Sequence, residues 1–255
     1  MKTSEQSSVQ EQWAAAESGV QQGLEDLFGA QWQRMQVRGY ESGEVEEDKE
    51  KTLKREKDFF VSVLEKVRSV QERTHGKTLI LFDVDETIGS AVYTSGNTFK
   101  TLLRPSLVPL LESLKARGVS IGLLTNRGQD ALQGQLSESD QLAPIASYLD
   151  RTHIYSSRGR AVEQSGEEIA ALLKTEEISG GQGVLDKKLL SENVEYTALG
   201  ASGDWEKIFV LQELKEKNPD TAIIAVDDFQ YPRFLNSRAG FYGVSLHDSG
   251  GFFKP

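Results

Sequence analysis

Residues 78–87 read Thr-Leu-Ile-Leu-Phe-Asp-Val-Asp-Glu-Thr, and this stretch decides the fold. Its first half, residues 78–82, is a short and continuous apolar run, which is typical of a strand buried on both faces. Residues 119–124 and 221–226 have the same character, and residues 241–246 form a weaker run of this kind. Strands buried on both faces belong to parallel sheets that are covered by helices, so the sequence predicts an α/β fold.

Segments with helical periodicity separate these apolar runs. One lies between Pro105 and Gly118, where a proline stands at the start and a glycine stands where a C-terminal cap is expected. Further helices are predicted within residues 131–149, before a weak strand at residues 152–155, and across residues 204–218. The alternation of strands and helices predicts a parallel sheet with right-handed crossovers.

Residues 1–75 differ in composition from the rest and are predicted to form a helical, partly disordered N-terminal arm. The first dozen residues are rich in Ser, Gln and Glu, which predicts disorder there. Apolar residues then recur at helical spacing in two stripes, separated by a break at residues 39–43. The stripes either pack on the core domain or form an arm for a protein partner or for self-association. Their members are Trp13, Val20, Leu24, Leu27 and Met35 in the first and Phe60, Val63, Leu64, Val67 and Val70 in the second.

Composition excludes several classes of function. The chain has 255 residues, 38% of them hydrophobic, and no apolar run approaches the roughly 20 residues of a membrane span. Its 29 Lys and Arg residues against 39 Asp and Glu give a net charge of −10, which disfavours broad contact with nucleic acid or an anionic membrane. With no cysteine and no secretory signal in the polar N-terminus, a cytoplasmic location is predicted. Any metal must then be held by oxygen ligands or histidines.

Each of the three strong apolar runs ends in a side chain that can bind phosphate or metal. Asp83 follows the first run, Thr125 the second and Asp227 the third. The carboxyl ends of parallel strands lie along one edge of a sheet, where ligands bind, so these residues are predicted to share one site. Asp85 can point into the same crevice, because it stands two residues after Asp83. One carboxylate is then placed to attack and the other to transfer protons.

The second and third strand ends predict a phosphate site beside a cation. Thr125 offers a hydroxyl followed by exposed backbone N–H groups, which suit a phosphate oxygen, although an ordinary helix cap has the same residues. The adjacent acids Asp227 and Asp228 repel each other unless a cation lies between them, and Mg²⁺ is the natural candidate for oxygen ligands. A lysine is expected to balance the phosphate charge. The candidates are Lys207, which is the best placed, and its rivals Lys187 and Lys188.

Together these residues resemble the four motifs of the haloacid dehalogenase superfamily, in the family's order. The first motif is Asp83-Val84-Asp85-Glu86-Thr87, and Thr125, Lys207 and the Asp227-Asp228 pair stand for the other three. The resemblance runs over residues 79–246, which is nearly the whole chain beyond the N-terminal arm. The Arg104-Pro105-Ser106 sequence and the leucine-rich helix after it are similar to the acid phosphatase and RNA polymerase C-terminal-domain phosphatase branches.

The resemblance implies a Rossmann-like three-layer sandwich around a parallel central sheet, with Mg²⁺-dependent catalysis. Asp83 would attack phosphorus, while Asp85 would protonate the leaving oxygen and later activate water. Asp85 also favours phosphate over haloacid substrates, because family members that act on carbon–halogen bonds lack this second aspartate. The implied residues are Asp83, Asp85, Thr125 and Lys207 for catalysis, Asp83, Asp85 through its backbone carbonyl, Asp227 and Asp228 for the metal, and Thr87, Asn126 and Arg127 for substrate contacts.

Residues 76–255 form the predicted catalytic domain. Residues 156–203 exceed what a minimal core needs, so they are predicted to be an insert, either a small cap that selects the substrate or a surface excursion. The predicted function is hydrolysis of a phosphomonoester on a small molecule or a phosphopeptide. Two alternatives stay open: a phosphotransferase that uses the same aspartyl-phosphate, and a weakly active domain that serves as a protein-interaction module.

Overall fold

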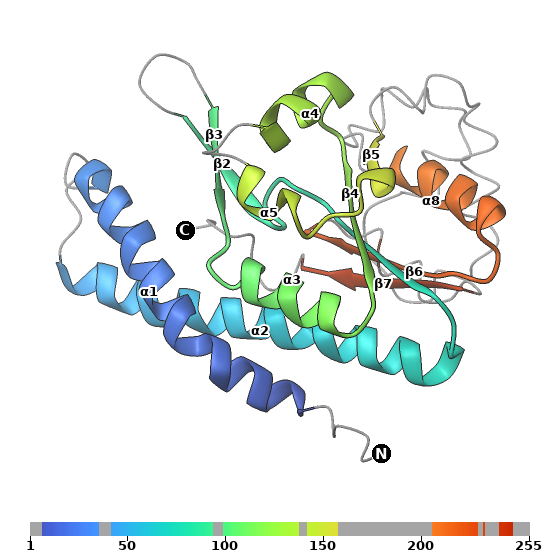
Figure 1. The fold of residues 1–255 in the computed structure, drawn as a ribbon. Coiled ribbons are helices and arrows are strands. Elements are labelled where there is room, and N and C mark those ends of the chain that lie inside the picture. The colour runs from blue at the N-terminus through green and yellow to red at the C-terminus, as the bar shows by residue number, and fades with distance from the viewer. Residues whose placement is uncertain are drawn as a thin grey trace, which may run out of the picture.

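The computed structural model describes residues 7–35, 42–93, 99–137, 142–157, 206–228, 232 and 240–246. Within these residues lies a five-stranded parallel sheet with the strand order β5-β4-β1-β6-β7 (Figure 1). The predicted α/β fold with a parallel sheet is confirmed, and the sheet is compatible with a Rossmann-like arrangement. The strands are β1 (Thr78–Phe82), β4 (Ser120–Thr125), β5 (Ile154–Ser156), β6 (Ala222–Asp227) and β7 (Phe241–Ser245).

Strand β1 is the central strand and is buried along its whole length. The chain passes from β1 outward to β4 and β5, and then returns to the other side of β1 through β6 and β7. Phe82, the last residue of β1, therefore lies beside Leu123 of β4 and Val226 of β6. The order of strands reverses at β1, and in open α/β sheets ligands bind outside the carboxyl ends of the strands at such a point.

Six α-helices accompany the sheet in the described part of the chain: α1 (Val9–Met35), α2 (Ser42–Thr74), α3 (Leu107–Ala116), α4 (Gln129–Ser137), α5 (Ala143–Ala146) and α8 (Glu206–Lys217). Helices α2 and α3 pack against each other, and Figure 1 shows α8 on the side of the sheet away from α2. Because side chains alternate along a strand, Ile80 and Phe82 enter the core shared with α2 and α3, while Leu79 and Leu81 are buried on the opposite face.

Helices α1 and α2 pack on the hydrophobic core of the sheet through their apolar stripes. Trp13 of α1 meets Phe60 of α2 edge to face, with the ring centroids 5.5 Å apart. Gly23 of α1 lies so close to Pro105 that a Cβ atom there would stand 2.9 Å from the proline Cβ. Of the two packing alternatives for the stripes, burial in the core is the one found, although the side chains of Leu27 and Met35 lie outside the described residues. Partner binding and self-association by this arm stay predictions.

The N-terminus of α1 corrects one prediction. Disorder was expected over the first dozen residues, but α1 begins at Val9, which is buried in the core. Ser8 and Glu11 cap this helix reciprocally: the Ser8 backbone N–H donates to Glu11 Oε2 at 2.6 Å, and the Glu11 N–H donates to Ser8 Oγ at 3.2 Å. This Ser-x-x-Glu pattern is the capping box, so the helix start was encoded in the sequence within the polar stretch.

A β-hairpin beside the sheet was not predicted. Strands β2 (Gly89–Tyr93) and β3 (Phe99–Leu103) pair antiparallel, with Gly89 opposite Leu103, and Figure 1 shows them beyond the carboxyl end of β1. Gly89 is required at the base, because a Cβ atom there would lie 2.6 Å from the Leu102 carbonyl oxygen. The predicted insert at residues 156–203 falls, beyond Ser157, outside the described residues.

Most element boundaries agree with the predicted ones, with small shifts at β5. A 3-10 turn at Arg151–His153 precedes β5, so the strand begins two residues later than the predicted weak strand. The Asp150 side chain caps this turn by accepting from the Thr152 backbone N–H at 3.0 Å. Gly118 follows α3 with a φ of 71°, the left-handed conformation expected of a glycine at a helix C-terminus. Among the described helices, none is long and apolar enough to cross a membrane.

Candidate active site

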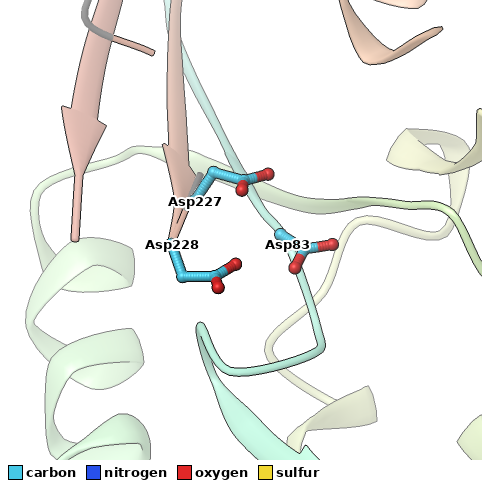
Figure 2. Close-up of side chains that lie close together, drawn as sticks. All are labelled: Asp83, Asp227 and Asp228. Carbon is cyan, nitrogen blue, oxygen red and sulfur yellow. The ribbon is translucent and has the colours of Figure 1, made fainter. Parts of the chain in front are cut away.

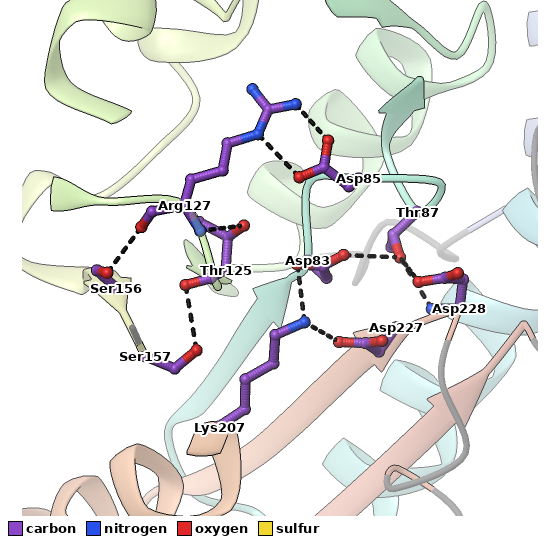
Figure 3. Close-up of polar contacts among 10 residues, drawn as sticks. All are labelled: Asp83, Asp85, Thr87, Thr125, Arg127, Ser156, Ser157, Lys207, Asp227 and Asp228. Carbon is purple, nitrogen blue, oxygen red and sulfur yellow. Dashed lines mark hydrogen bonds and ion pairs between the residues drawn. The ribbon is translucent and has the colours of Figure 1, made fainter. Parts of the chain in front are cut away.

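Three neighbouring strands deliver polar residues to one edge of the sheet. Asp83 directly follows β1, Thr125 ends β4 and Asp227 ends β6, so the two flanking strands place their last residues on either side of Asp83. The Asp83 backbone N–H donates to the Val226 carbonyl at 2.9 Å, which continues the β1–β6 pairing to the aspartate itself. Figure 3 shows these residues around one centre. The predicted convergence of the three strand ends is therefore present in the structure.

Asp83, Asp227 and Asp228 form an acidic cluster at this edge (Figure 2). Each offers one carboxylate oxygen, and the three oxygens lie within 4.8 Å of one another. Asp83 and Asp227 are buried and Asp228 is half-buried. Three carboxylates this close repel one another in a poorly hydrated place, so they need positive charge nearby.

Lys207, in the first turn of α8, supplies part of that charge. Its Nζ lies 2.9 Å from Asp83 Oδ1 and donates to Asp227 Oδ2 at 2.7 Å, and its side chain is 0% exposed. The lysine thus joins the residue after β1 to the last residue of β6 (Figure 3). Sequence alone left Lys187 and Lys188 as rivals, and both lie outside the described residues.

The protonation of Asp83 reflects these surroundings. Burial raises the pKa of Asp83 to about 7; Lys207 counteracts the rise, and the neighbouring Asp227 carboxylate adds to it. Without a bound cation the group therefore titrates near neutral pH. A divalent cation among the three carboxylates would favour the ionised form, which is also the form that can act as a nucleophile.

Thr87 lies between the two acidic strand ends and contacts both of them (Figure 3). Its hydroxyl accepts from the Asp228 backbone N–H at 2.9 Å, and lies 3.5 Å from Asp83 Oδ2 and 3.4 Å from Asp228 Oδ1. A single hydroxyl hydrogen serves one of these carboxylates at a time. Thr87 is fully buried, and its hydroxyl contacts orient the two carboxylates. A direct contact of Thr87 with substrate stays a prediction.

Asp85 occupies a different environment from Asp83. Arg127 binds its carboxylate with two donors, Nε to Oδ2 at 2.9 Å and Nη2 to Oδ1 at 2.5 Å. The Asp85 side chain is 48% exposed, whereas that of Arg127 is 12% exposed. Arg127 also donates to Thr101 Oγ1 of the hairpin at 3.1 Å and to Gln135 Oε1 of α4. Arg127, predicted as a substrate contact, thus holds the second aspartate of the first motif.

Thr125 begins a turn that β5 helps to fix. Its fully buried hydroxyl accepts from the Arg127 backbone N–H at 3.4 Å, and its carbonyl accepts from the Ser157 N–H at 2.9 Å. Ser156 Oγ donates to the Arg127 carbonyl at 2.7 Å. Sequence analysis missed both serines, although the Ser-Ser pair at the end of a predicted weak strand was a possible signal.

Asn126, which was predicted as a substrate contact, has a buried Oδ1 atom without a hydrogen-bond partner among the described residues.

No protein-family model matches this chain, and a search of curated proteins finds no match. The function is therefore inferred from the motifs and from the geometry of this site.

Proposed function

We propose that this protein is a Mg²⁺-dependent phosphohydrolase of the haloacid dehalogenase type, with Asp83 as the nucleophile. The observation that carries the proposal is the contact of Lys207 with both Asp83 and Asp227, beside the third acid, Asp228. Phosphoryl transfer through an aspartate requires a buried nucleophile, a lysine and carboxylates that can bind a divalent cation, and these groups meet here at one edge of the sheet.

The residues present fit a magnesium ion. Asp83, Asp227 and Asp228 are hard oxygen donors whose carboxylates lie close enough together to bind one cation, and the Asp85 backbone carbonyl is proposed as a further ligand. Few carboxylates suffice, because Mg²⁺ keeps several waters and substrate oxygens in its coordination shell. When bound, the ion would supply positive charge for the phosphoryl oxygens and align them with Asp83.

In the first step, a carboxylate oxygen of Asp83 forms a bond to phosphorus while the bond from phosphorus to the leaving oxygen breaks. Asp85 gives its proton to that leaving oxygen, and the product is an aspartyl-phosphate on Asp83. Lys207 balances the charge that collects beside Asp83. The Thr125 hydroxyl and the backbone N–H groups after it are proposed to bind a phosphoryl oxygen.

In the second step, water attacks the phosphorus of the aspartyl-phosphate and Asp85 takes the proton of that water. The bond between phosphorus and Asp83 breaks, inorganic phosphate leaves, and both aspartates return to their starting states. Arg127 has to release one oxygen of Asp85 before Asp85 can carry a proton. Phosphate competes well for a guanidinium, so substrate itself is suited to loosen this pair.

The proposed substrate class is limited by the composition of the chain. We propose a phosphorylated small molecule or a phosphopeptide, since the net charge of −10 disfavours a polyanionic nucleic acid. The insert predicted at residues 156–203 is either a small cap that selects the substrate or a surface excursion, and it lies outside the described residues beyond Ser157. A chain without cysteine suits the reducing cytoplasm, which is the proposed location.

The test is hydrolysis of p-nitrophenyl phosphate by the purified full-length protein, with Mg²⁺ and with a chelator. We expect Mg²⁺-dependent release of p-nitrophenol that Asp83→Asn abolishes, because an amide is not a nucleophile. Asp58→Asn is the matched control, since it makes the same change at an exposed position of α2. Acid-quenched enzyme should carry phosphate on the peptide that contains Asp83, detected by mass spectrometry. Full activity of Asp83→Asn would exclude the mechanism.

A further inference from the structure

A buried ion pair joins helix α2 to the segment that follows the hairpin. Arg104 Nη1 lies 2.8 Å from Glu56 Oε1, and the two side chains are 3% and 0% exposed. Glu56 Oε2 accepts from the Ser106 backbone N–H at 3.2 Å and from the Ser106 hydroxyl. The Glu56 carboxylate thus has a charged partner and two further donors, although it stands in a highly charged stretch of sequence.

Arg104 reaches from Glu56 to the first-motif loop, defined here as residues 83–87. Its Nε donates to the Thr87 carbonyl, and its Nη2 donates to the Glu86 carbonyl at 3.4 Å. The Arg104 backbone N–H also donates to the Ile88 carbonyl at 2.9 Å. Glu86 has a φ of 57°, which is uncommon for a residue other than glycine and persists where the surroundings fix it. The arginine therefore holds the loop at its most constrained peptide groups.

Helix α2 supports the arginine in a second way. The Arg104 guanidinium carbon lies 4.6 Å from the ring centroid of Phe59, in a cation–π contact. The Phe59 ring is in turn 6.5 Å from the ring of Phe82, the last residue of β1 before Asp83. Consecutive turns of α2 thus provide both the negative partner and the aromatic face for one buried arginine beside the nucleophile.

Stability alone does not account for such a pair. Removing two charges from water costs free energy. Replacing a buried ion pair by apolar residues of similar volume is therefore often neutral or stabilising for the fold. A guanidinium offers what apolar side chains lack, namely several donors in a fixed planar arrangement. Those donors here end on the carbonyl groups of the loop that carries Asp85 and Thr87.

We propose that Glu56 and Arg104 are positioning residues of the active site, through which helix α2 fixes the first-motif loop. The inference rests on the proposed function, since the loop matters for turnover only if Asp83 and Asp85 catalyse. It makes α2 a part of the catalytic apparatus, although the sequence assigned this segment to a separate arm. Neither residue needs to touch substrate.

The experiment compares full-length Arg104→Met, Glu56→Gln and the double variant Glu56→Met/Arg104→Met with the wild type. The double variant removes both charges, so it is expected to fold even if a single change leaves one buried charge unpaired. Glu72→Gln is the matched control, because Glu72 lies on the same helix in an exposed pair with Arg68. Hydrogen exchange of backbone amides in residues 84–89 is measured beside that of β1, and kcat and KM are measured with p-nitrophenyl phosphate.

We expect the amides of residues 84–89 to exchange about tenfold to a hundredfold faster in the double variant, while those of β1 stay protected. We also expect kcat to fall about a hundredfold with little change in KM, because the reacting groups are misplaced after substrate has bound. Glu72→Gln should match the wild type in both measurements. A double variant that exchanges and turns over like the wild type would refute the positioning role.

The two proposals fail in different ways. A wild-type protein that lacks Mg²⁺-dependent phosphatase activity would overturn the proposed function, whereas exchange in residues 84–89 reports on the loop without any turnover. Unchanged exchange in Arg104→Met and in the double variant would overturn the role of Arg104 and Glu56, even in an active enzyme. Uniformly faster exchange over β1 and the loop would also contradict it, because the pair would then be a general structural element.

Discussion

The two aspartates of the first-motif loop stand two residues apart in surroundings that differ in almost every respect. Asp83 is 5% exposed and contacts Lys207, while Asp85 is 48% exposed and pairs with Arg127. Asp83 directly follows the central strand, whereas Asp85 lies in a turn beside the hairpin. The Asp83 side chain is held in a fixed, poorly hydrated place, and the Asp85 side chain reaches solvent. The proposed division into a nucleophile and a proton carrier requires such a difference.

Removing Lys207 should have the largest effect, because it breaks the Asp83 environment while leaving that of Asp85. In Lys207→Met, three clustered carboxylates lose a fully buried cation, so turnover should disappear and the free energy of unfolding should fall by about 3–5 kcal/mol without Mg²⁺. Urea denaturation measures the loss, and added Mg²⁺ should restore part of it. Lys217→Met is the control, since the Lys217 side chain is 72% exposed. Equal stability of both variants would contradict the role given to Lys207.

Changing Asp85 should separate activity from stability. Asp85→Asn removes the proton carrier, so kcat for p-nitrophenyl phosphate should fall about 10²- to 10⁴-fold. Its pair with Arg127 is half-exposed on the Asp85 side, so the free energy of unfolding should change by less than about 1 kcal/mol. Steady-state kinetics and urea denaturation on the same preparation test both statements. A large loss of stability with retained turnover would reverse the comparison of the two aspartates.

Variants of Arg127 test how strongly turnover depends on the hydrogen bonds that hold Asp85. Arg127→Met loses the two donors to Asp85 together with those to Thr101 and Gln135, and kcat/KM should fall about tenfold. Arg127→Lys keeps the charge without the planar pair of donors, so we expect only partial recovery. Initial rates at low substrate concentration measure the ratio. Full recovery in the lysine variant would show that charge alone matters at this position.

The smallest predicted effect is a pH dependence of stability that belongs to Asp83. Burial raises the pKa of Asp83 from its ordinary value of 3.8 to about 7, so between these two pH values the folded protein keeps a proton that the unfolded chain has lost. This stabilisation is complete below the unfolded pKa and is lost as pH rises through about 7. The metal-free protein should therefore melt a few degrees lower at pH 8 than at pH 5, with roughly 2–4 °C for each kcal/mol lost.

Asp83→Asn is the variant that checks this assignment, because an amide does not titrate. Its melting temperature should depend less on pH than that of the wild type, and Mg²⁺ should no longer change the slope. Thermal melts followed by circular dichroism, once with a chelator and once with Mg²⁺, measure both slopes. An Asp83→Asn variant with the wild-type slope would assign the pH dependence to other groups.

Sequence predicted best what short segments encode by themselves. The three central parallel strands were found because each is a continuous apolar run, and Asp83, Thr125 and Asp227 were found because they end such runs. The hairpin of β2 and β3 was missed because its strands are not continuous apolar runs, and their pairing depends on contact between separate segments.

Contacts between distant residues could not be predicted in the same way. Glu56 stands within a charged stretch and looks like a surface residue, yet it is fully buried. Its buried partner, Arg104, comes 48 positions later, so no local pattern in the sequence reveals the pair. Lys207 was preferred over two other lysines only by its place at the start of the helix that precedes the third strong strand, and the structure shows its contacts with both acids. Arg127 was expected to meet substrate, and its pairing with Asp85 depends on the fold of two loops.

The connection between Ser157 and α8 is tethered to the site at both of its ends. Ser157 bonds the Thr125 carbonyl on one side, and Lys207 reaches Asp83 soon after the chain enters α8 on the other. An engineer who exchanges this connection for that of another protein should therefore place the splice points inside these two residues. Donor segments could then differ in length and chemistry while Asp83 and Lys207 keep their places.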